Sequence, residues 1–318
     1  MKKAAVTLAF SVCVLAAFSQ GTSVYSFFVN VVNEDFKLPL IGFANTAKGS
    51  HSGLQAGFIN TNTGDFSGLQ AGFVNTTVGS VSGAQVGFVN TAAKEAHGAQ
   101  VGFVNTAVNE AHGAQVGFVN TAVQGIDGVQ VGFVNVARQK ISGVQLGFVN
   151  YADSIESGIP IGFLSIVRRG GYHAFEYSFS EFYPAAVGFK TGVEKFYASF
   201  FLAYNPAHNF TWSGVATGFG VGSIIPVKNA FFFNPELNSL NPLGKNDTQL
   251  TSFTPLFGYN FSKHFSITAG LSLTWSHSGG DGELQKPFFK IHNFEIDNNN
   301  SIVVGARVGV RYRFFTKR

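Results

Sequence analysis

Hydrophobic and polar positions recur with a period of fifteen residues through the first half of the chain. A Gly-Phe pair occurs nine times between Gly42 and Gly162, with no insertion or deletion. Typical units read GLQAGFINT, GAQVGFVNT and GVQLGFVNY. A fixed period of this kind is typical of tandem repeats, in which each unit packs against its neighbours. Residues 25–168 are therefore predicted to form an array of β repeats.

Each unit is expected to contain a strand, a turn and a second, weaker apolar contact. Side chains alternate between the two faces of a strand. In the unit 143–152 this alternation would place Phe148 and Asn150 on one face and Gln145 on the other. The second apolar position lies in the linking segment, at Phe36, Phe66, Val81, Ala96, Ala111, Ile126 and Ile141.

Two architectures fit this pattern. In a β-solenoid each unit is one coil, and equivalent residues stack in parallel register about 4.8 Å apart. In a transmembrane barrel each unit is one antiparallel strand of about ten residues, a length that spans a bilayer. The solenoid is favoured, with Phe and Asn ladders inside, and a single barrel of about eighteen strands is the alternative.

The side-chain amides distinguish these two architectures. In-register stacking lets an amide bond to its own copies in the neighbouring coils, which explains why it is identical in every unit. In a barrel, one of the two amide sets would face lipid, where an unsatisfied amide costs several kcal/mol. The predicted ladders are Phe43, Phe58, Phe73, Phe88, Phe103, Phe118, Phe133 and Phe148; Asn60, Asn75, Asn90, Asn105, Asn120 and Asn135; and Gln70, Gln85, Gln100, Gln115 and Gln130.

The second half, residues 170–318, has a different pattern. Ile267, Ala269, Leu271, Leu273 and Trp275 alternate with small or polar residues, as do Val304 to Phe314 near the end of the chain. Alternation of this kind, with aromatic residues at the strand ends, is typical of outer-membrane barrel strands. Eight antiparallel strands are predicted, near 172–181, 184–192, 195–205, 211–224, 229–236, 249–260, 264–276 and 301–315. The fold class is thus all-β, a solenoid followed by an eight-stranded barrel.

Three arginines of the last strand are expected to face the barrel interior. Arg307, Arg311 and Arg313 fall on the small or charged face of that strand. Glu176 and Glu194 are candidate partners for them. An interior ion-pair network is favoured over a role in solute selectivity.

The N-terminus and the composition point to an exported protein. Residues 1–19 contain two lysines, a short apolar run and small residues at Ala17 and Ser19, which is the pattern of a secretory signal peptide. Its Cys13 is the chain's single cysteine, so disulfides are not expected in the mature protein. Without Lys2 and Lys3 the charge is nearly balanced, and nucleic acid is not an expected partner.

The G-x-Q-x-G-F-x-N units resemble the tandem surface-repeat proteins of diderm bacteria. The resemblance covers about 150 residues and extends into the segment LSIVRRGGYH that follows the repeats. It implies an exported envelope or surface protein. It supplies no catalytic residue and no known ligand. The aromatic end of the last strand, Phe314 and Phe315, resembles the signal read by the barrel-assembly machinery, and the signal peptide and amphipathic strands predict contact with outer-membrane lipid.

No catalytic or cofactor motif stands out in the sequence. His97 and His112 share one repeat position and could stack, but no third ligand follows at that phase. We therefore expect no enzyme activity, no cofactor and no metal site. Two functions remain: binding or envelope organisation by the repeat array, in which an envelope or host ligand is a possible partner, or transport through a pore formed by one large barrel.

Overall fold

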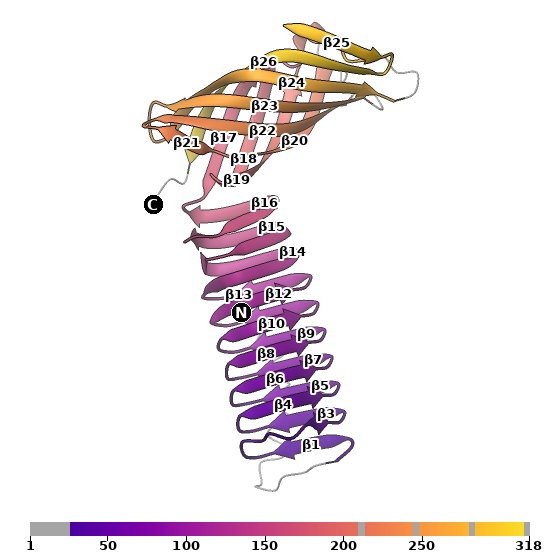
Figure 1. Ribbon diagram of the computed structural model, residues 1–318, viewed down its shortest axis with the longest axis vertical. Coiled ribbons are helices and arrows are strands. Elements are labelled where there is room, and N and C mark those ends of the chain that lie inside the picture. Colours follow the sequence, from indigo (N-terminus) through magenta and orange to yellow (C-terminus); the bar gives the residue numbers. More distant parts are fainter. Residues whose placement is uncertain (1–25, 209–213, 244–247, 280–283, 315–318) are drawn as a thin grey trace. The chain divides into compact units, whose positions relative to one another are not determined.

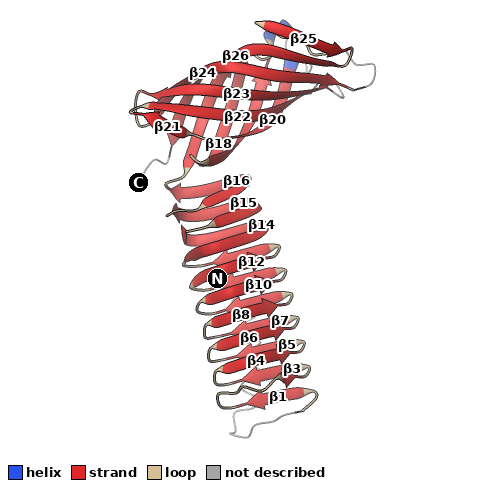
Figure 2. Cartoon of the chain, in the orientation of Figure 1, coloured by secondary structure: helices blue, strands red, loops and turns tan. Residues whose placement is uncertain are grey.

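The structure is a computed structural model that describes residues 26–208, 214–243, 248–279 and 284–314. Most of these residues lie in strands, and the others lie in loops and in a 3-10 turn, Pro206–His208 (Figure 2). No helix among them is long and apolar enough to cross a membrane. The predicted signal peptide, 1–19, and the last residues, 315–318, lie outside the described residues. The chain divides after Gly158 into two compact units.

The repeats form a β-solenoid of about nine coils over residues 29–169 (Figure 1), and the single barrel of about eighteen strands is therefore wrong. Each coil adds one strand to each of two parallel rows, and equivalent residues fifteen apart are paired, as Asn90 with Asn105 and Gln85 with Gln100. The first row holds β1 (Val29–Val32), β3 (Ala44–Ala47), β5 (Ile59–Asn62), β7 (Val74–Thr77), β9 (Val89–Ala92), β11 (Val104–Ala107) and β13 (Val119–Ala122). The second holds β2 (Leu40–Ile41), β4 (His51–Ala56), β6 (Phe66–Ala71), β8 (Val81–Val86), β10 (Ala96–Val101) and β12 (Glu110–Val116). β14 (Gly125–Ile141) pairs with both β12 and β13, and β15 (Val144–Ile155) and β16 (Ile159–Arg169) follow.

Two glycines recur in each coil for different reasons. Gly98 has a φ of 122°, a conformation that side chains disfavour. Gly102 begins the bend at the Gly-Phe pair, where a Cβ would lie 2.0 Å from the carbonyl oxygen of Gly87 and 2.6 Å from Nδ2 of Asn90. Close stacking of the coils therefore requires glycine at position 102.

This bend corrects two expectations about side-chain direction. The chain turns at Gly147 and Phe148, so the alternation restarts, and Gln145 and Asn150 both point inward and are fully buried. The expected inward Phe ladder is wrong, since Phe148 is 46% exposed and its equivalents are similar. Phe43, Phe58, Phe73, Phe88, Phe103, Phe118 and Phe133 likewise lie on the outside of the coils.

The solenoid interior is narrow and consists of four rows of side chains. Two rows are the Asn and Gln amides. A third holds the residues two positions after each Asn, which are alanines in most coils, such as Ala92, Ala107 and Ala122, and Val32, Asn62 and Thr77 in the others. The fourth contains the buried linking-segment residues Phe66, Val81, Ala96, Ala111, Ile126 and Ile141, with His51 in the same row. Small side chains in the third row allow the two strand rows to approach closely.

The second half forms the predicted eight-stranded antiparallel barrel. It closes by pairing of its first and last strands, β17 and β26. The strands are β17 (Tyr172–Phe179), β18 (Ala185–Val193), β19 (Phe196–Tyr204), β20 (Val215–Gly222), β22 (Phe231–Pro242), β23 (Thr248–Asn260), β24 (Phe265–Ser278) and β26 (Asn300–Phe314). Two further strands lie in connections: β21 (Ile225–Lys228) pairs with β22, and β25 (His292–Asp297) pairs with β26. β22 extends beyond the predicted strand 229–236, to Pro242, because its pairing with β20 and β23 continues there.

The barrel has an apolar outside and a polar inside, the reverse of a soluble protein. Its exposed outer residues include Val187, Leu202, Phe257, Leu271 and Val308. Buried inner residues on the same strands include Ser199, Thr268, Ser272 and Arg307. The short turns 194–195 and 261–264 lie at the end where β17 begins and β26 ends, because neighbouring strands are antiparallel.

Strand β16 lies against the outer wall of the barrel at that end, within the same compact unit. The ring of Phe163 is 4.6 Å from that of Phe200, centroid to centroid. Thr191 Oγ1 donates a buried 2.6 Å hydrogen bond to the carbonyl oxygen of Ser165. His173 Nε2 lies 2.9 Å from the carbonyl oxygen of Val167. These contacts attach β16 to strands β17, β18 and β19.

Candidate functional site

The buried asparagines form a continuous hydrogen-bonded ladder. Each Nδ2 donates to Oδ1 of the Asn fifteen residues later, over 2.8–2.9 Å, from Asn30 to Asn150. The same Nδ2 also donates to the backbone, as Asn105 does to the carbonyl of Val116 at 2.9 Å. This second bond fixes which way each amide points. The ladder begins at Ser26, whose backbone N–H donates to Oδ1 of Asn30.

The glutamines form a second ladder that points the opposite way. Gln100 Nε2 donates to Oε1 of Gln85, fifteen residues earlier, and the bonds from Gln70 to Gln145 measure 2.6–2.7 Å. Aligned amides in one ladder polarise each other, which strengthens the individual bonds. Because the two ladders run in opposite directions, their dipoles oppose each other inside the coil. The repeat positions beyond the ladder are occupied by Leu40 and Pro160, which have no side-chain amide.

The phenylalanines form an exposed aromatic row along one edge of the solenoid. From Phe58 to Phe148 neighbouring rings are parallel within 7°, with centroids 4.9–5.0 Å apart. Each of these rings leaves nearly half of its surface exposed. Exposed aliphatic side chains lie two residues before several of them, at Val86, Val101, Val116 and Leu146. We call the eight repeat phenylalanines from Phe43 to Phe148, together with these aliphatic residues, the aromatic edge.

His97 and His112 stack as the repeat phase suggests, with ring centroids 4.8 Å apart. Each lies near a glutamate of its own coil, His97 at 3.0 Å from Glu95 and His112 at 3.3 Å from Glu110. Across the described ranges, no group of three or more His, Cys, Asp or Glu side chains is placed to hold a metal ion. The two histidines are surface residues that contact glutamates of their own coils.

The barrel interior is filled by a buried ionic network. Arg307 and Arg311 each contact both Glu176 and Glu236, and Lys190 Nζ lies 3.5 Å from Glu176 Oε2 and within hydrogen-bond distance of Glu236. Their side chains are at most 8% exposed. Three cationic and two anionic groups thus meet across the lumen, and salt bridges from several strands obstruct it at this level.

Sequence reasoning placed part of this network and missed the rest. The three arginines were assigned to the interior, and Arg313 pairs with Glu194 at 3.2 Å near the short-turn end. Lys190 and Glu236 were missed. Both alternate with apolar outward neighbours, Phe189 and Leu237, so the period-two pattern that identified the arginines could have found them.

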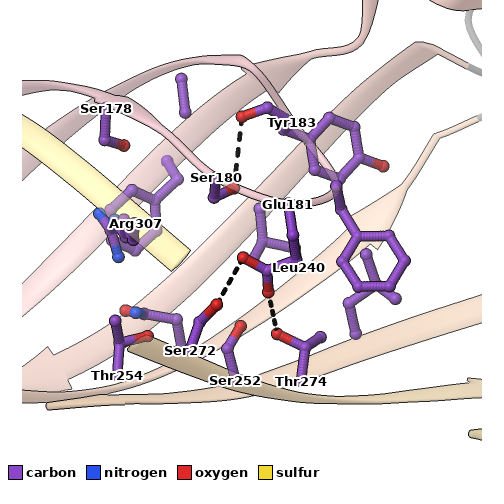
Figure 3. Close-up of a pocket in the computed structure, with 15 residues that line it drawn as sticks. Ser178, Ser180, Glu181, Tyr183, Leu240, Ser252, Thr254, Ser272, Thr274 and Arg307 are labelled. Atoms are coloured by element: carbon purple, nitrogen blue, oxygen red, sulfur yellow. Dashed lines mark hydrogen bonds between the residues drawn. The ribbon is translucent and has the colours of Figure 1, made fainter. Parts of the chain in front are cut away.

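A small cavity lined by both polar and apolar side chains lies next to the network (Figure 3). Its centre is Glu181, from the connection between β17 and β18, which accepts hydrogen bonds from Ser272 Oγ at 2.6 Å and from Thr274 Oγ1. The cavity of about 30 Å³ also includes Arg307 and Tyr183. A volume of this size holds one or two water molecules, which is too little for an organic substrate.

Comparison with family models, with curated proteins and with solved structures gave no significant match. We therefore infer its function from the geometry of the described residues.

Proposed function

We propose that this chain is a non-enzymatic outer-membrane protein whose solenoid is an extended binding module with an envelope-organising role. The observation that carries the proposal is the aromatic edge. Eight phenylalanine rings, each about 45–48% exposed, offer on the order of 700 Å² if a ring side chain has about 200 Å² of surface. Apolar patches of this size on a protein surface mark sites of interaction.

Membrane location is supported by the barrel. The outer face of the barrel is apolar, which suits contact with lipid, and its polar side chains face the interior, as in outer-membrane barrels. The sequence adds the signal-peptide pattern of 1–19 and the resemblance to surface-repeat proteins. Export through the inner membrane, insertion by the barrel-assembly machinery and contact with outer-membrane lipid form part of the proposal. Recovery of the mature chain in the soluble periplasmic fraction, without detergent, would contradict it.

The barrel favours anchoring over transport. Eight-stranded barrels have interiors just wide enough for side chains, whereas barrels of sixteen or more strands leave an aqueous channel. Here the lumen holds the network of Lys190, Arg307, Arg311, Glu176 and Glu236. In planar bilayers the refolded chain should therefore give no stable openings of large conductance.

Site-specific photo-crosslinking in intact cells tests the binding role. The photoreactive residue p-benzoylphenylalanine would replace Phe103 on the aromatic edge, and His97, exposed outside the edge, would be the control position. We expect a crosslinked product of discrete mass from position 103 and none from position 97. Absence of products from positions 73, 103 and 133 alike would refute binding through this edge.

A further inference from the structure

A groove of about 990 Å³ lies on the outside of the barrel at its short-turn end. One wall is the C-terminal part of β16, and the other is the barrel surface at β18 and β26. Leu164, Ile166, Phe189 and Phe314 give the groove an apolar lining. Its volume falls at the upper end of the range typical of ligand sites, about 300–1,000 Å³.

Positive charge gathers around this apolar lining. Arg168 and Arg169 come from the end of β16, and Lys263 and His264 come from the turn between β23 and β24. Segments far apart in the sequence thus place three permanent cations around one groove. None of the described residues that line it is a carboxylate.

The contacts of β16 make the groove a built feature of this unit. The bond from Thr191 Oγ1 to the Ser165 carbonyl and the contact of His173 with the Val167 carbonyl are both buried. They hold the backbone on either side of Ile166, the residue that points an exposed side chain into the groove. The groove is therefore more confined than the open barrel surface, which any membrane lipid can cover.

We propose that this groove binds an anionic phospholipid. An acyl chain would occupy the apolar lining, and the phosphate would be held by Arg168, Arg169 and Lys263. Basic pockets beside membrane-spanning segments recognise anionic headgroups in this way, and guanidinium groups match phosphate oxygens bidentately. The inference takes the barrel to be membrane-embedded, as proposed above, and is independent of any binding by the aromatic edge.

Native mass spectrometry of the full chain, purified in a nonionic detergent, tests the proposal. Phosphatidylglycerol and phosphatidylcholine of equal acyl length would be titrated separately, and the bound lipids counted. We expect preferential retention of phosphatidylglycerol. Glycerophosphoglycerol, which has the phosphodiester headgroup of phosphatidylglycerol but no acyl chain, should bind more than tenfold more weakly because burial of each methylene is favourable. Equal retention of the two lipids would overturn the proposal.

Two kinds of variant assign the binding to this groove. The variant R168Q/R169Q/K263Q should weaken phosphatidylglycerol binding by on the order of fivefold for each charge removed. Its matched control, K228Q/K286Q/K290Q, removes the same charge from exposed lysines that do not line the groove and should bind normally. Ile166→Trp keeps the cations but fills the lining, and should also lose the lipid.

Folding of each variant is checked by heat-modifiable gel mobility. If the triple variant fails to fold, Lys263→Gln alone, on an exposed turn, still tests the proposal through an expected loss of about fivefold. Unchanged phosphatidylglycerol binding in the folded groove variants would refute it. That result would leave the membrane location and the aromatic edge unaffected, because fractionation and crosslinking test them separately.

Discussion

The side-chain amide of Asn105 donates a 2.8 Å hydrogen bond to Oδ1 of Asn120, its own repeat equivalent one coil later. It also accepts one from Asn90 and donates a second to the carbonyl of Val116. A fully buried amide thus has three hydrogen-bond partners within the protein. Continuity of this kind makes the solenoid cooperative from coil to coil.

Replacing Asn105 by Leu should destabilise the central coils strongly. The change leaves the Asn90 N–H and the Asn120 oxygen without this partner, whereas the Val116 carbonyl keeps its bond from the Gly102 N–H. Each buried unpaired group costs about 1–3 kcal/mol. Hydrogen exchange of the amides in β9 to β13 should accelerate. Asn109→Leu, at a partly exposed turn, is the control and should change exchange little. Protection equal to wild type in Asn105→Leu would show that the ladder does not contribute to stability.

His51 should make the first coils sensitive to acid. Burial lowers the pKa of this imidazole below its ordinary value of 6.5, although the nearby Leu38 carbonyl acts in the opposite direction. The folded state then binds fewer protons than the unfolded state. The free energy of unfolding is therefore unaffected by this group above about pH 6.5, and it decreases as the pH falls below that value. Protection of the amides in β3 to β6 should decrease over that range.

The variant His51→Phe is expected to remove this pH dependence. Phe36 and Phe66 occupy the same repeat position in the adjacent coils and stack on His51 at 5.9 and 5.6 Å, so a third phenylalanine fits the row. His97→Ser, which copies Ser82 of the previous coil, is the control and should retain the wild-type profile in β3 to β6. A pH profile unchanged by His51→Phe would assign the effect to another group.

Gly102→Ala should disrupt stacking of the coils at the Gly-Phe bend. The new methyl would lie 2.0 Å from the Gly87 carbonyl oxygen, which belongs to the backbone and cannot move alone. Overpacking of this kind costs about 1–3 kcal/mol and sometimes more. Thermal unfolding followed by far-UV circular dichroism should shift to lower temperature. Val101→Ala, at the neighbouring exposed position, should have a much smaller effect.

Glu236→Gln should destabilise the barrel. It removes one of the two glutamates that contact Lys190, Arg307 and Arg311 among the described residues, and breaking a buried ion pair in this way costs about 3–5 kcal/mol. The fraction that migrates as the compact, unheated form should fall in urea titrations. Adding Lys190→Met restores the original balance of charge and should recover part of the loss. A double variant no more stable than Glu236→Gln would argue against charge imbalance as the cause.

Local sequence patterns were sufficient for much of the architecture. Equivalent residues such as Asn90 and Asn105 are identical because in-register stacking brings each into contact with its own copy. Likewise, alternation along β24 and β26 marked barrel strands within two residues of their observed bounds, because side-chain direction in a strand depends only on neighbouring residues.

Side-chain direction around the coil was decided by tertiary structure. A bend at Gly147 and Phe148 turns Gln145 and Asn150 to the same interior and leaves the phenylalanine outside. Period-two alternation assumes a straight strand, so it cannot show where that bend falls.

The sequence by itself determined the fifteen-residue period and the eight barrel strands, and it favoured the parallel stacking of equivalent residues. Tertiary structure decided what closes the barrel interior and what covers its wall. Arg311 meets Glu236 across 75 residues of sequence, and Ser165 meets Thr191 across 26. Contacts of this kind form only when the barrel closes and brings distant segments together. A local sequence pattern does not show which distant residues will meet.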